Sequence, residues 1–245
     1  MTTTEDRVAV VLGAKNLGGA VAGHLIEHGW RVASVARSEE TVQAAGERGA
    51  LGIAADASDG GQLAAALARA RDELGPPQLI VNAVSASRPP DDGAGFGGGP
   101  IAGASLEGFR GWTVAVAEQA FVFLSTGIAA LQEAGTGGTL IQVTGGSSRR
   151  AMPGRGLWSA GGQATRAMVH AAAQEQREQG IHVALLIVDA TIESPKTAPY
   201  TRDAPDNSLA DQRLIAEAVQ FLAEQEPRAY THELMLTPAG DRWVP

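Results

Sequence analysis

The sequence predicts an α/β protein built on one doubly wound parallel sheet of about seven strands, with helices on both faces. Two observations predict this fold class. Short apolar runs rich in β-branched residues alternate with longer amphipathic stretches, which is typical of parallel strands joined by right-handed helical crossovers. The chain also has 245 residues, 44% of them hydrophobic, enough to bury one large core. Because no linker or internal repeat interrupts it, we expect residues 1–245 to form a single domain.

The first two elements set the pattern. Residues 7–12 form an apolar β-branched run, as expected of a buried parallel strand. Gly13 and Gly18 bracket a short turn, and apolar residues recur at helical spacing from Leu17 until Gly29 ends the helix. A helix that begins inside such a turn presents free backbone N–H groups and the positive end of its dipole, which favours a bound phosphate. The alternative is a packing glycine in an ordinary strand–helix turn.

The remaining elements follow in the same rhythm. The further strands expected are residues 31–36, 51–55, 78–82, 139–144, 181–188 and 232–237. The further helices expected are residues 39–48, 61–74, 106–133, 155–179 and 210–224. Two stretches, residues 85–105 and 194–211, interrupt the alternation of strands and helices. Both are rich in glycine or proline, and we expect both to be mobile loops.

Composition argues against several functional classes. A net charge of -8 and a pI of about 5.1 argue against a nucleic-acid surface, which requires clustered Lys and Arg. The chain has no cysteine, which excludes a disulfide framework and a thiolate nucleophile, and we expect no metal site. Its N-terminal stretch lacks the features of a signal peptide, and no apolar run reaches the ~18 residues that a membrane span needs. We therefore expect a cytoplasmic protein that acts on a small molecule and binds neither nucleic acid nor membrane.

Three motifs lie where predicted strands end. The glycine turn reads Gly13-Ala-Lys-Asn-Leu-Gly18, Asp56-Ala57 follows the third strand, and Asn82-Ala83-Val84 ends the fourth. With the order of the elements, these motifs make essentially the whole chain resemble the short-chain dehydrogenase/reductase family, which has a Rossmann-like fold. The turn is about one residue shorter than the family's usual form, and Asn16 takes the middle-glycine position, where Asn tolerates the left-handed conformation. The resemblance implies these dinucleotide-binding residues: Gly13, Lys15, Asn16, Leu17, Gly18, Arg37, Asp56, Ala57, Asn82, Ala83 and Val84.

The residue after the second strand bears on the choice of cofactor. A dinucleotide fold that chooses NAD usually places an acidic residue there, which accepts from the ribose 2′-OH. This chain has Arg37, a cation that favours the 2′-phosphate of NADP(H), and Lys15 in the glycine turn supplies a second positive charge. The alternative is an ion pair between Arg37 and Glu39 or Glu40. We expect NADP(H) rather than NAD(H).

The catalytic positions depart from the family's pattern. Typical members use a serine, a tyrosine, a lysine and an asparagine to hold the carbonyl oxygen and to move its proton. Alignment of this sequence places Gly145, Trp158, Gly162 and Val116 at those four positions. An indole N–H is a donor only, and glycine and valine offer no polar side chain. Residues 143–146 and 231–238 resemble a divergent branch of the family that lacks the Tyr–Lys pair.

Three functions therefore remain open. The first is an NADP(H)-dependent oxidoreductase acting on a carbonyl/alcohol small molecule, with Thr144 and Ser147 as the replacement hydroxyls beside Trp158. The second is a non-redox enzyme, such as a dehydratase, isomerase or cyclase, with Trp158 as an apolar wall and Glu118 or Asp189 as base. The third is a catalytically inactive NADP(H)-binding protein. Fold resemblance supports the cofactor more than the reaction, because function depends on the site.

The two long helices bear on assembly. Family members commonly associate through the helices that follow the fourth and fifth strands, and here both helices carry apolar side chains such as Phe121 and Met168. The alternative is that these side chains only pack in the core. The resemblance implies a homo-dimer or homo-tetramer.

Overall fold

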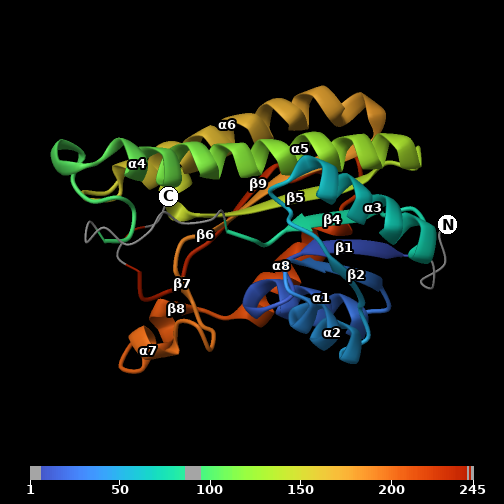
Figure 1. Cartoon of the computed structure of the whole chain (residues 1–245), viewed down its shortest axis with the longest axis horizontal. Helices are drawn as coiled ribbons and strands as arrows, with labels where there is room; N and C mark the ends of the chain where they lie inside the picture. The colour runs from blue at the N-terminus through green and yellow to red at the C-terminus, as the bar shows by residue number, and fades with distance from the viewer. Residues whose placement is uncertain (1–6, 86–94, 242, 244–245) are drawn as a thin grey trace.

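The computed structural model describes residues 7–85, 95–241 and 243, and it confirms the expected architecture. Seven parallel strands form one sheet in the order β3-β2-β1-β4-β5-β6-β9 (Figure 1). The strands are β1 (Val8–Leu12), β2 (Arg31–Ala36), β3 (Leu51–Ala54), β4 (Leu79–Asn82), β5 (Gly138–Gly145), β6 (Ile181–Val188) and β9 (Glu233–Leu236). β2 and β6 have the expected bounds, and each of the other five strands differs from its expected range by one residue at one or both ends.

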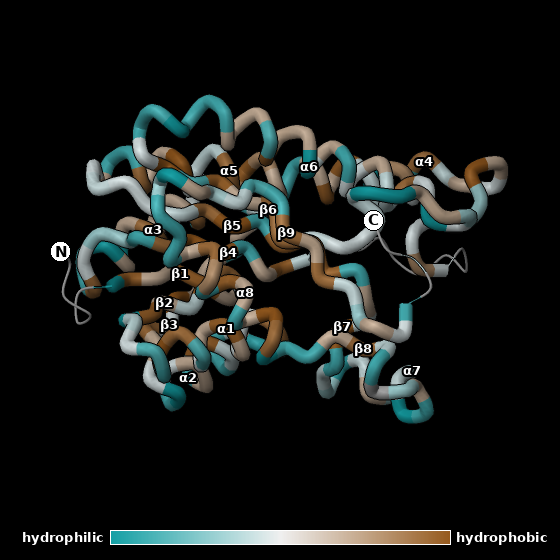
Figure 2. The backbone as a smooth tube through the Cα atoms, turned by 180° about the vertical axis from the view of Figure 1, so that it is seen from behind, coloured by the Kyte–Doolittle hydropathy of each residue, from teal (hydrophilic) through white to brown (hydrophobic). Residues whose placement is uncertain are grey.

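Helices cover the sheet in two layers (Figure 1). One layer is α3 (Gly60–Leu74), α5 (Ala115–Ala134) and α6 (Gly156–Gln176), and the other is α1 (Asn16–Glu27), α2 (Glu39–Glu47) and α8 (Gln212–Ala223). Alternate strand residues supply the two cores, so that Leu140 packs under the first layer and Ile141 under the second. Figure 2 shows the hydrophobic residues concentrated in the strands between these layers.

The direction of the chain across the sheet reverses at β1. β2 and β3 extend the sheet on one side of β1, whereas β4, β5, β6 and β9 extend it on the other. At the carboxyl ends of these strands, Leu12 pairs with Val35 on one side and with Asn82 on the other. The segments that follow these three residues therefore lie side by side, and open α/β sheets bind their ligands at such a switch point.

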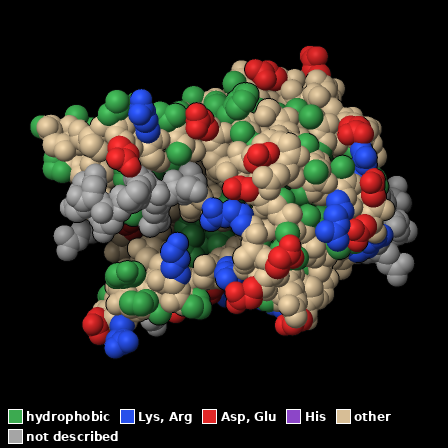
Figure 3. Space-filling model, viewed as in Figure 1, with side chains coloured by type: hydrophobic (Ala, Val, Ile, Leu, Met, Phe, Trp, Pro, Cys, Tyr) green, Lys and Arg blue, Asp and Glu red, His purple; other side chains and the backbone are tan. Residues whose placement is uncertain are grey.

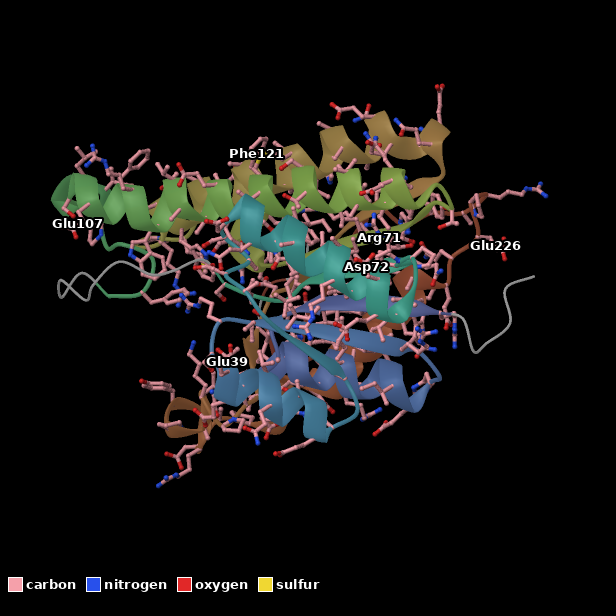
Figure 4. All side chains as sticks on the ribbon, turned by 45° about the vertical axis from the view of Figure 1, so that its right-hand side comes forward. Glu39, Arg71, Asp72, Glu107, Phe121 and Glu226 are labelled. Carbon is pink, nitrogen blue, oxygen red and sulfur yellow. The ribbon has the colours of Figure 1, made fainter. Side chains whose placement is uncertain are left out.

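Residues 106–134 form one long helix composed of α4 (Leu106–Phe109), a π-helical segment (Arg110–Val114) and α5. By length and composition this helix is apolar enough to cross a membrane. In the structure it is a layer of the fold instead, with Phe123 buried against the sheet. Phe121 lies on its outer surface, 59% exposed (Figure 4). The homo-dimer or homo-tetramer expected from such a face stays a prediction.

The two expected loops differ from the prediction in different ways. Residues 194–211 are not loop throughout, because they contain α7 (Ala198–Thr201) and β8 (Leu209–Ala210), which pairs in parallel with β7 (Thr191–Ile192). Two-residue strands are too short to show a period, and proline, which suggested a break, is favoured in the first turn of a helix such as α7. In the other stretch, residues 86–94 lie outside the described residues, and residues 101–103 form a short 3₁₀ helix.

A buried histidine at the start of β6 gives the fold a pH dependence. His182 is fully buried, its ring stacks on Tyr230 with centroids 4.2 Å apart, and Nε2 lies 3.0 Å from the carbonyl oxygen of Thr231. Burial lowers the pKa of His182 below its usual value, although the hydrogen bond to Thr231 opposes that change.

We expect His182→Gln to reduce the pH dependence of stability below neutral pH. In the unfolded chain the imidazole takes up its proton near pH ~6.5, whereas in the folded chain it stays neutral to lower pH. The unfolded state therefore binds more protons, and the free energy of unfolding falls as the pH drops from about 6.5 toward the folded pKa. Urea unfolding at pH 7.5 and 5.5 measures the difference, which should be smaller in the variant. An equal difference in both proteins would contradict the assignment.

Candidate active site

The turn between β1 and α1 uses two backbone conformations that most residues avoid. Gly13 has φ +103°, and Asn16 has φ +47°, the one positive φ at a non-glycine residue in the described part of the chain. Asn16 thus adopts the left-handed conformation expected of it. Leu17 and Gly18 are buried, and a Cβ on Gly18 would lie 2.3 Å from the carbonyl oxygen of Gly13. The turn closes so tightly that Gly18 accepts no side chain unless the backbone moves.

The first turn of α1 presents backbone donors at the carboxyl edge of the sheet. Lys15 is the N-cap residue and its side chain makes no capping hydrogen bond, while the first N–H groups of a helix have no intrahelical acceptor. Lys15 and Asn16 are both exposed. The guanidinium of Arg48, which follows α2, donates to the carbonyl oxygen of Ala14 at 2.9 Å and so connects the turn between β1 and α1 to the end of α2. Sequence reasoning missed Arg48, because nothing local links residues 34 positions apart.

Arg37 lies directly after β2, exposed to solvent. Among the residues that the structure describes, no carboxylate lies within 4.0 Å of its guanidinium, so the alternative ion pair with Glu39 or Glu40 does not form. Those two glutamates instead occupy the first turn of α2, where the helix dipole favours acidic residues. The Arg37 guanidinium therefore remains available to an anion at the end of β2.

Asp56 follows β3 and is held as a carboxylate. The hydroxyl and the backbone N–H of Ser58 donate to Asp56 Oδ1 at 2.7 and 2.9 Å. These hydrogen bonds lower the pKa of Asp56, and the charge of Arg37 lowers it further. Ala57, the next residue, is buried. Asp56 and Arg37 are therefore close enough for their charges to interact without forming an ion pair.

A buried amide network supports the end of β4. Asn82 Nδ2 donates to Gln142 Oε1 at 2.9 Å, and Asn82 Oδ1 accepts from Gln119 Nε2 at 3.3 Å and from the N–H of Val84 at 3.2 Å. All three amide side chains are buried, whereas Ala83 and Val84 are partly exposed. Paired amides satisfy each other's polar atoms and fix the backbone where β4 ends. Sequence reasoning missed Gln142, although a polar residue at an inward position of a core strand is a usable signal.

The hydroxyls predicted at the end of β5 differ in access. Thr144 is partly exposed. Ser147 is 4% exposed, and its Oγ is buried with no hydrogen-bond partner in the described part of the chain. Between them, a Cβ on Gly145 would lie 3.4 Å from Cη2 of Trp158. The indole thus covers the position where an aligned serine side chain would project.

Gly162 on α6 and Val116 on α5 are the positions aligned with the family's lysine and asparagine, and both lie near the end of β5. A Cβ on Gly162 would lie 3.2 Å from the backbone N of Ser148, and one on its neighbour Gly161 would lie 3.0 Å from Cβ of Val116. The end of β5, the first half of α6 and the start of α5 therefore come together without a titratable side chain at any of the four aligned positions.

Three aromatic rings gather at this junction, which sequence reasoning did not predict. Phe96, Trp112 and Trp158 form an edge-to-face cluster with centroid separations of 4.4 Å for Phe96–Trp158, 5.1 Å for Phe96–Trp112 and 6.5 Å for Trp112–Trp158. Trp112 belongs to the π-helical segment, a feature that is frequent at functional sites. We call these three residues the aromatic cluster.

An arginine and two aspartates form a charged cluster next to the end of β5. Arg150 Nη2 lies 3.2 Å from Oδ2 of the buried Asp189, without hydrogen-bond geometry, and 3.9 Å from Asp241 Oδ2. The Arg150 guanidinium also lies 4.3 Å from the ring centroid of Trp243. A Cβ on Gly146 would lie only 1.8 Å from Asp189 Oδ1. The Asp189 carboxylate thus pairs with Arg150 and occupies the space that a side chain at Gly146 would need.

The surface has a hollow at the carboxyl edge of the sheet. Figure 3 shows the hollow between the arm that carries α4 and the projection that carries α7, with Lys and Arg side chains at its rim. A second, open hollow of about 710 Å³ lies on the projection, lined by side chains between Glu193 and Gln212. It contains none of the predicted site residues, which instead surround the strand ends.

Comparison with known proteins identifies the family and the fold. The family described as short chain dehydrogenase matches residues 7–203. No curated protein matches the chain. Among solved structures, an alcohol dehydrogenase from the archaeon Thermococcus sibiricus, complexed with 5-hydroxy-NADP, is 22% identical with a TM-score of 0.76, covering 98% of this chain and 99% of its own.

Two further structures are similar over their full length. A single-substitution variant of the actinorhodin polyketide ketoreductase with NADPH is 20% identical with a TM-score of 0.80, covering 99% of this chain and 100% of its own. An NADPH-bound short chain oxidoreductase from Pseudomonas aeruginosa PAO1, described as containing an atypical catalytic center, is 20% identical with a TM-score of 0.80, covering 98% of each chain. At these identities the likeness shows the fold.

Proposed function

This chain belongs to the short-chain dehydrogenase family, and from that premise we propose that it is an NADP(H)-dependent oxidoreductase acting on a carbonyl/alcohol small molecule with a non-standard active site. The observation that carries the proposal is the turn between β1 and α1, where Gly18 leaves no room for a Cβ against the Gly13 carbonyl. With such close backbone packing, the N–H groups of the first helical turn would face a bound phosphate.

The residues present fit the dinucleotide. The first turn of α1 would hold the pyrophosphate, and Asp56 with Ala57 would lie against the adenine. Arg37 and Lys15 would hold the 2′-phosphate, because Arg37 has no carboxylate partner in the described chain. The backbone that Asn82 fixes at the end of β4 would support the nicotinamide ribose.

Proton handling is where this site differs from the family's usual one. When bound, NADPH supplies a hydride to a carbonyl carbon, and the carbonyl oxygen must take up a proton. Thr144 is the better-supported donor, because this residue is partly exposed whereas the Ser147 hydroxyl is buried. Its proton would be replaced from solvent. Trp158 would exclude water from one side of the reacting carbonyl.

The two alternative functions have weaker support. A non-redox reaction needs a base, but the Asp189 carboxylate is paired with Arg150, and Glu118 is exposed on α5. A protein that binds the dinucleotide without turnover needs only the turn and Arg37. The lack of a titratable side chain at Val116, Gly145, Trp158 and Gly162 favours this last alternative over the non-redox enzyme.

We expect NADPH to bind more tightly than NADH, and Arg37→Asp to reverse that order. An arginine–phosphate pair is a charge-assisted interaction worth about 1.5–3 kcal/mol, so that the preference should change by at least about tenfold. Fluorescence titration of both nucleotides measures it, with Arg177→Asp, an exposed substitution at the far end of α6, as the charge-matched control. Equal affinities that the variant leaves unchanged would overturn the NADP(H) assignment.

Turnover is tested by mixing the protein with NADPH and a panel of carbonyl compounds while following nicotinamide absorbance. The proposal predicts oxidation of NADPH with at least one compound, reduced about 10²-fold or more by Thr144→Val, since a positioned proton donor contributes roughly that much. NADPH binding without oxidation by any carbonyl would favour the inactive binding protein. A product formed without change in the nucleotide would favour the non-redox enzyme.

A further inference from the structure

The aromatic cluster lies where a substrate would meet the end of β5. Its three rings come from three separate segments, namely the stretch after residue 94, the π-helical segment and the first turn of α6. The Trp158 ring reaches the position of Gly145, and Phe96 is 39% exposed. Aromatic residues make up only 4% of the chain, so three of them around one strand end form a concentrated apolar surface.

The backbone that carries Phe96 is built to hold it there. Gly95, Gly97, Gly98 and Gly99 all have positive φ, which few other residues tolerate. A Cβ on Gly98 would lie 2.7 Å from Leu157 Cδ1 and 3.1 Å from Trp112 Cδ1, and one on Gly97 would lie 2.9 Å from Arg155 Cγ. The segment therefore packs directly on the start of α6 and on Trp112.

One cation beside the cluster has no acidic partner among the described residues. Of the three arginines between β5 and α6, Arg149 pairs with Glu233 and Arg150 with Asp189. Arg155 has no carboxylate within 4.0 Å in the part of the chain that the structure describes, and its guanidinium lies 5.4 Å from the Phe96 ring centroid. Arg155 is exposed, and without a carboxylate partner its guanidinium is available to an anionic group of a ligand bound beside the aromatic cluster.

We propose that the substrate is an aromatic carbonyl or alcohol that carries an anionic group, with its ring against Trp158 and Trp112 and its anion on Arg155. This deepens the proposed function by naming the substrate class of the same site. Ring edges and faces recognise a planar aromatic better than a flexible aliphatic chain, and the guanidinium fork suits a carboxylate.

Three probes separate the two recognition elements: 4-formylbenzoate has both ring and anion, benzaldehyde has only the ring, and 4-oxobutanoate has only the anion. Calorimetric titration of the full chain, with NADP⁺ bound and without nucleotide, should rank 4-formylbenzoate at least about tenfold tighter than either other probe. The inference is overturned if 4-oxobutanoate or benzaldehyde binds as tightly as 4-formylbenzoate.

Substitutions of Arg155 and Trp158 separate the contribution of the cation from that of the ring to probe binding. Arg155→Gln should weaken 4-formylbenzoate about tenfold and leave benzaldehyde unchanged. If it weakens both probes equally, Arg155 only holds the Phe96 segment, and the anion assignment is wrong. Trp158→Leu should weaken both aromatic probes and spare 4-oxobutanoate, and Trp158→Phe, which keeps a ring, should restore much of the loss. Arg177→Gln and Phe221→Leu, both exposed and outside the aromatic cluster, are the controls.

Failure of this inference is distinguishable from failure of the proposed function. Absence of NADP⁺ binding overturns the proposed function, whereas the ranking of the probes without nucleotide still tests the substrate class. Binding of NADP⁺ with no preference among the probes leaves the proposed function standing and rejects the substrate class.

Discussion

Gly18→Ala is expected to abolish most NADPH binding. The new Cβ would lie 2.3 Å from the Gly13 carbonyl oxygen and 2.6 Å from its carbonyl carbon, both backbone atoms, so the turn itself has to open. Overpacking of this kind costs about 1–3 kcal/mol in stability, or roughly 2–12 °C in melting temperature. The larger effect is on affinity, because the N–H groups of the first turn of α1 move away from the phosphate. We expect a loss of at least about a hundredfold, measured by quenching of tryptophan fluorescence.

Gly23→Ala on the same helix is the matched control. A Cβ at Gly23 meets no atom within 4 Å, and its φ is not positive. Because glycine inside a helix costs about 0.5–1 kcal/mol relative to alanine, this variant should be slightly more stable than the wild type and should bind NADPH equally well. If Gly18→Ala binds NADPH as the Gly23→Ala control does, the turn is a packing feature and not a phosphate site.

The second large effect is expected from Gly146→Ala. The new Cβ would lie 1.8 Å from Asp189 Oδ1 and 2.2 Å from its carboxyl carbon, so the buried carboxylate has to move. That displacement breaks the ion pair with Arg150 and leaves a buried charge uncompensated. Breaking a buried pair costs about 3–5 kcal/mol, and we expect a loss near the lower limit, since Arg150 is partly exposed. Chemical denaturation of the purified protein measures it.

A double-mutant cycle separates the collision from other effects of the substitution. With Asp189→Ala already present, the carboxylate that would collide is gone, and Gly146→Ala should cost much less than in the wild type. Additive costs for the two substitutions would show that the contact between Gly146 and Asp189 does not matter. Gly103→Ala, where a Cβ meets nothing within 4 Å, controls for the replacement of a glycine without a collision.

The fold could be predicted because its signals are local and repeated. Strand and helix periods alternate along the whole chain, and each predicted strand of the sheet is present. The conformation of the glycine turn could also be predicted from the sequence. The residues that it requires, Gly13, Asn16 and Gly18, lie within six consecutive positions. The guanidinium of Arg37 was open to two interpretations, and only the structure, in which no described carboxylate lies within 4.0 Å of it, decides against the ion pair with Glu39 or Glu40.

The remaining features depend on contacts that no local pattern encodes. Gln142 meets Asn82 across 60 positions, and Phe96 meets Trp158 because a glycine-rich stretch of positive φ folds back on α6. The pair β7–β8 is too short to show a period. Solvent access to the two hydroxyl residues could not be predicted either. Ser147 and Thr144 both lie at the end of β5, but the Ser147 hydroxyl is buried whereas Thr144 is partly exposed.

A crystal structure of the protein with NADPH bound tests the central claim most directly. The account predicts the pyrophosphate at the first turn of α1, the 2′-phosphate on Arg37, and Trp158 beside the nicotinamide with no tyrosine hydroxyl or lysine ammonium in contact with it. A nucleotide bound away from the turn, or a tyrosine and a lysine reaching the nicotinamide, would contradict it.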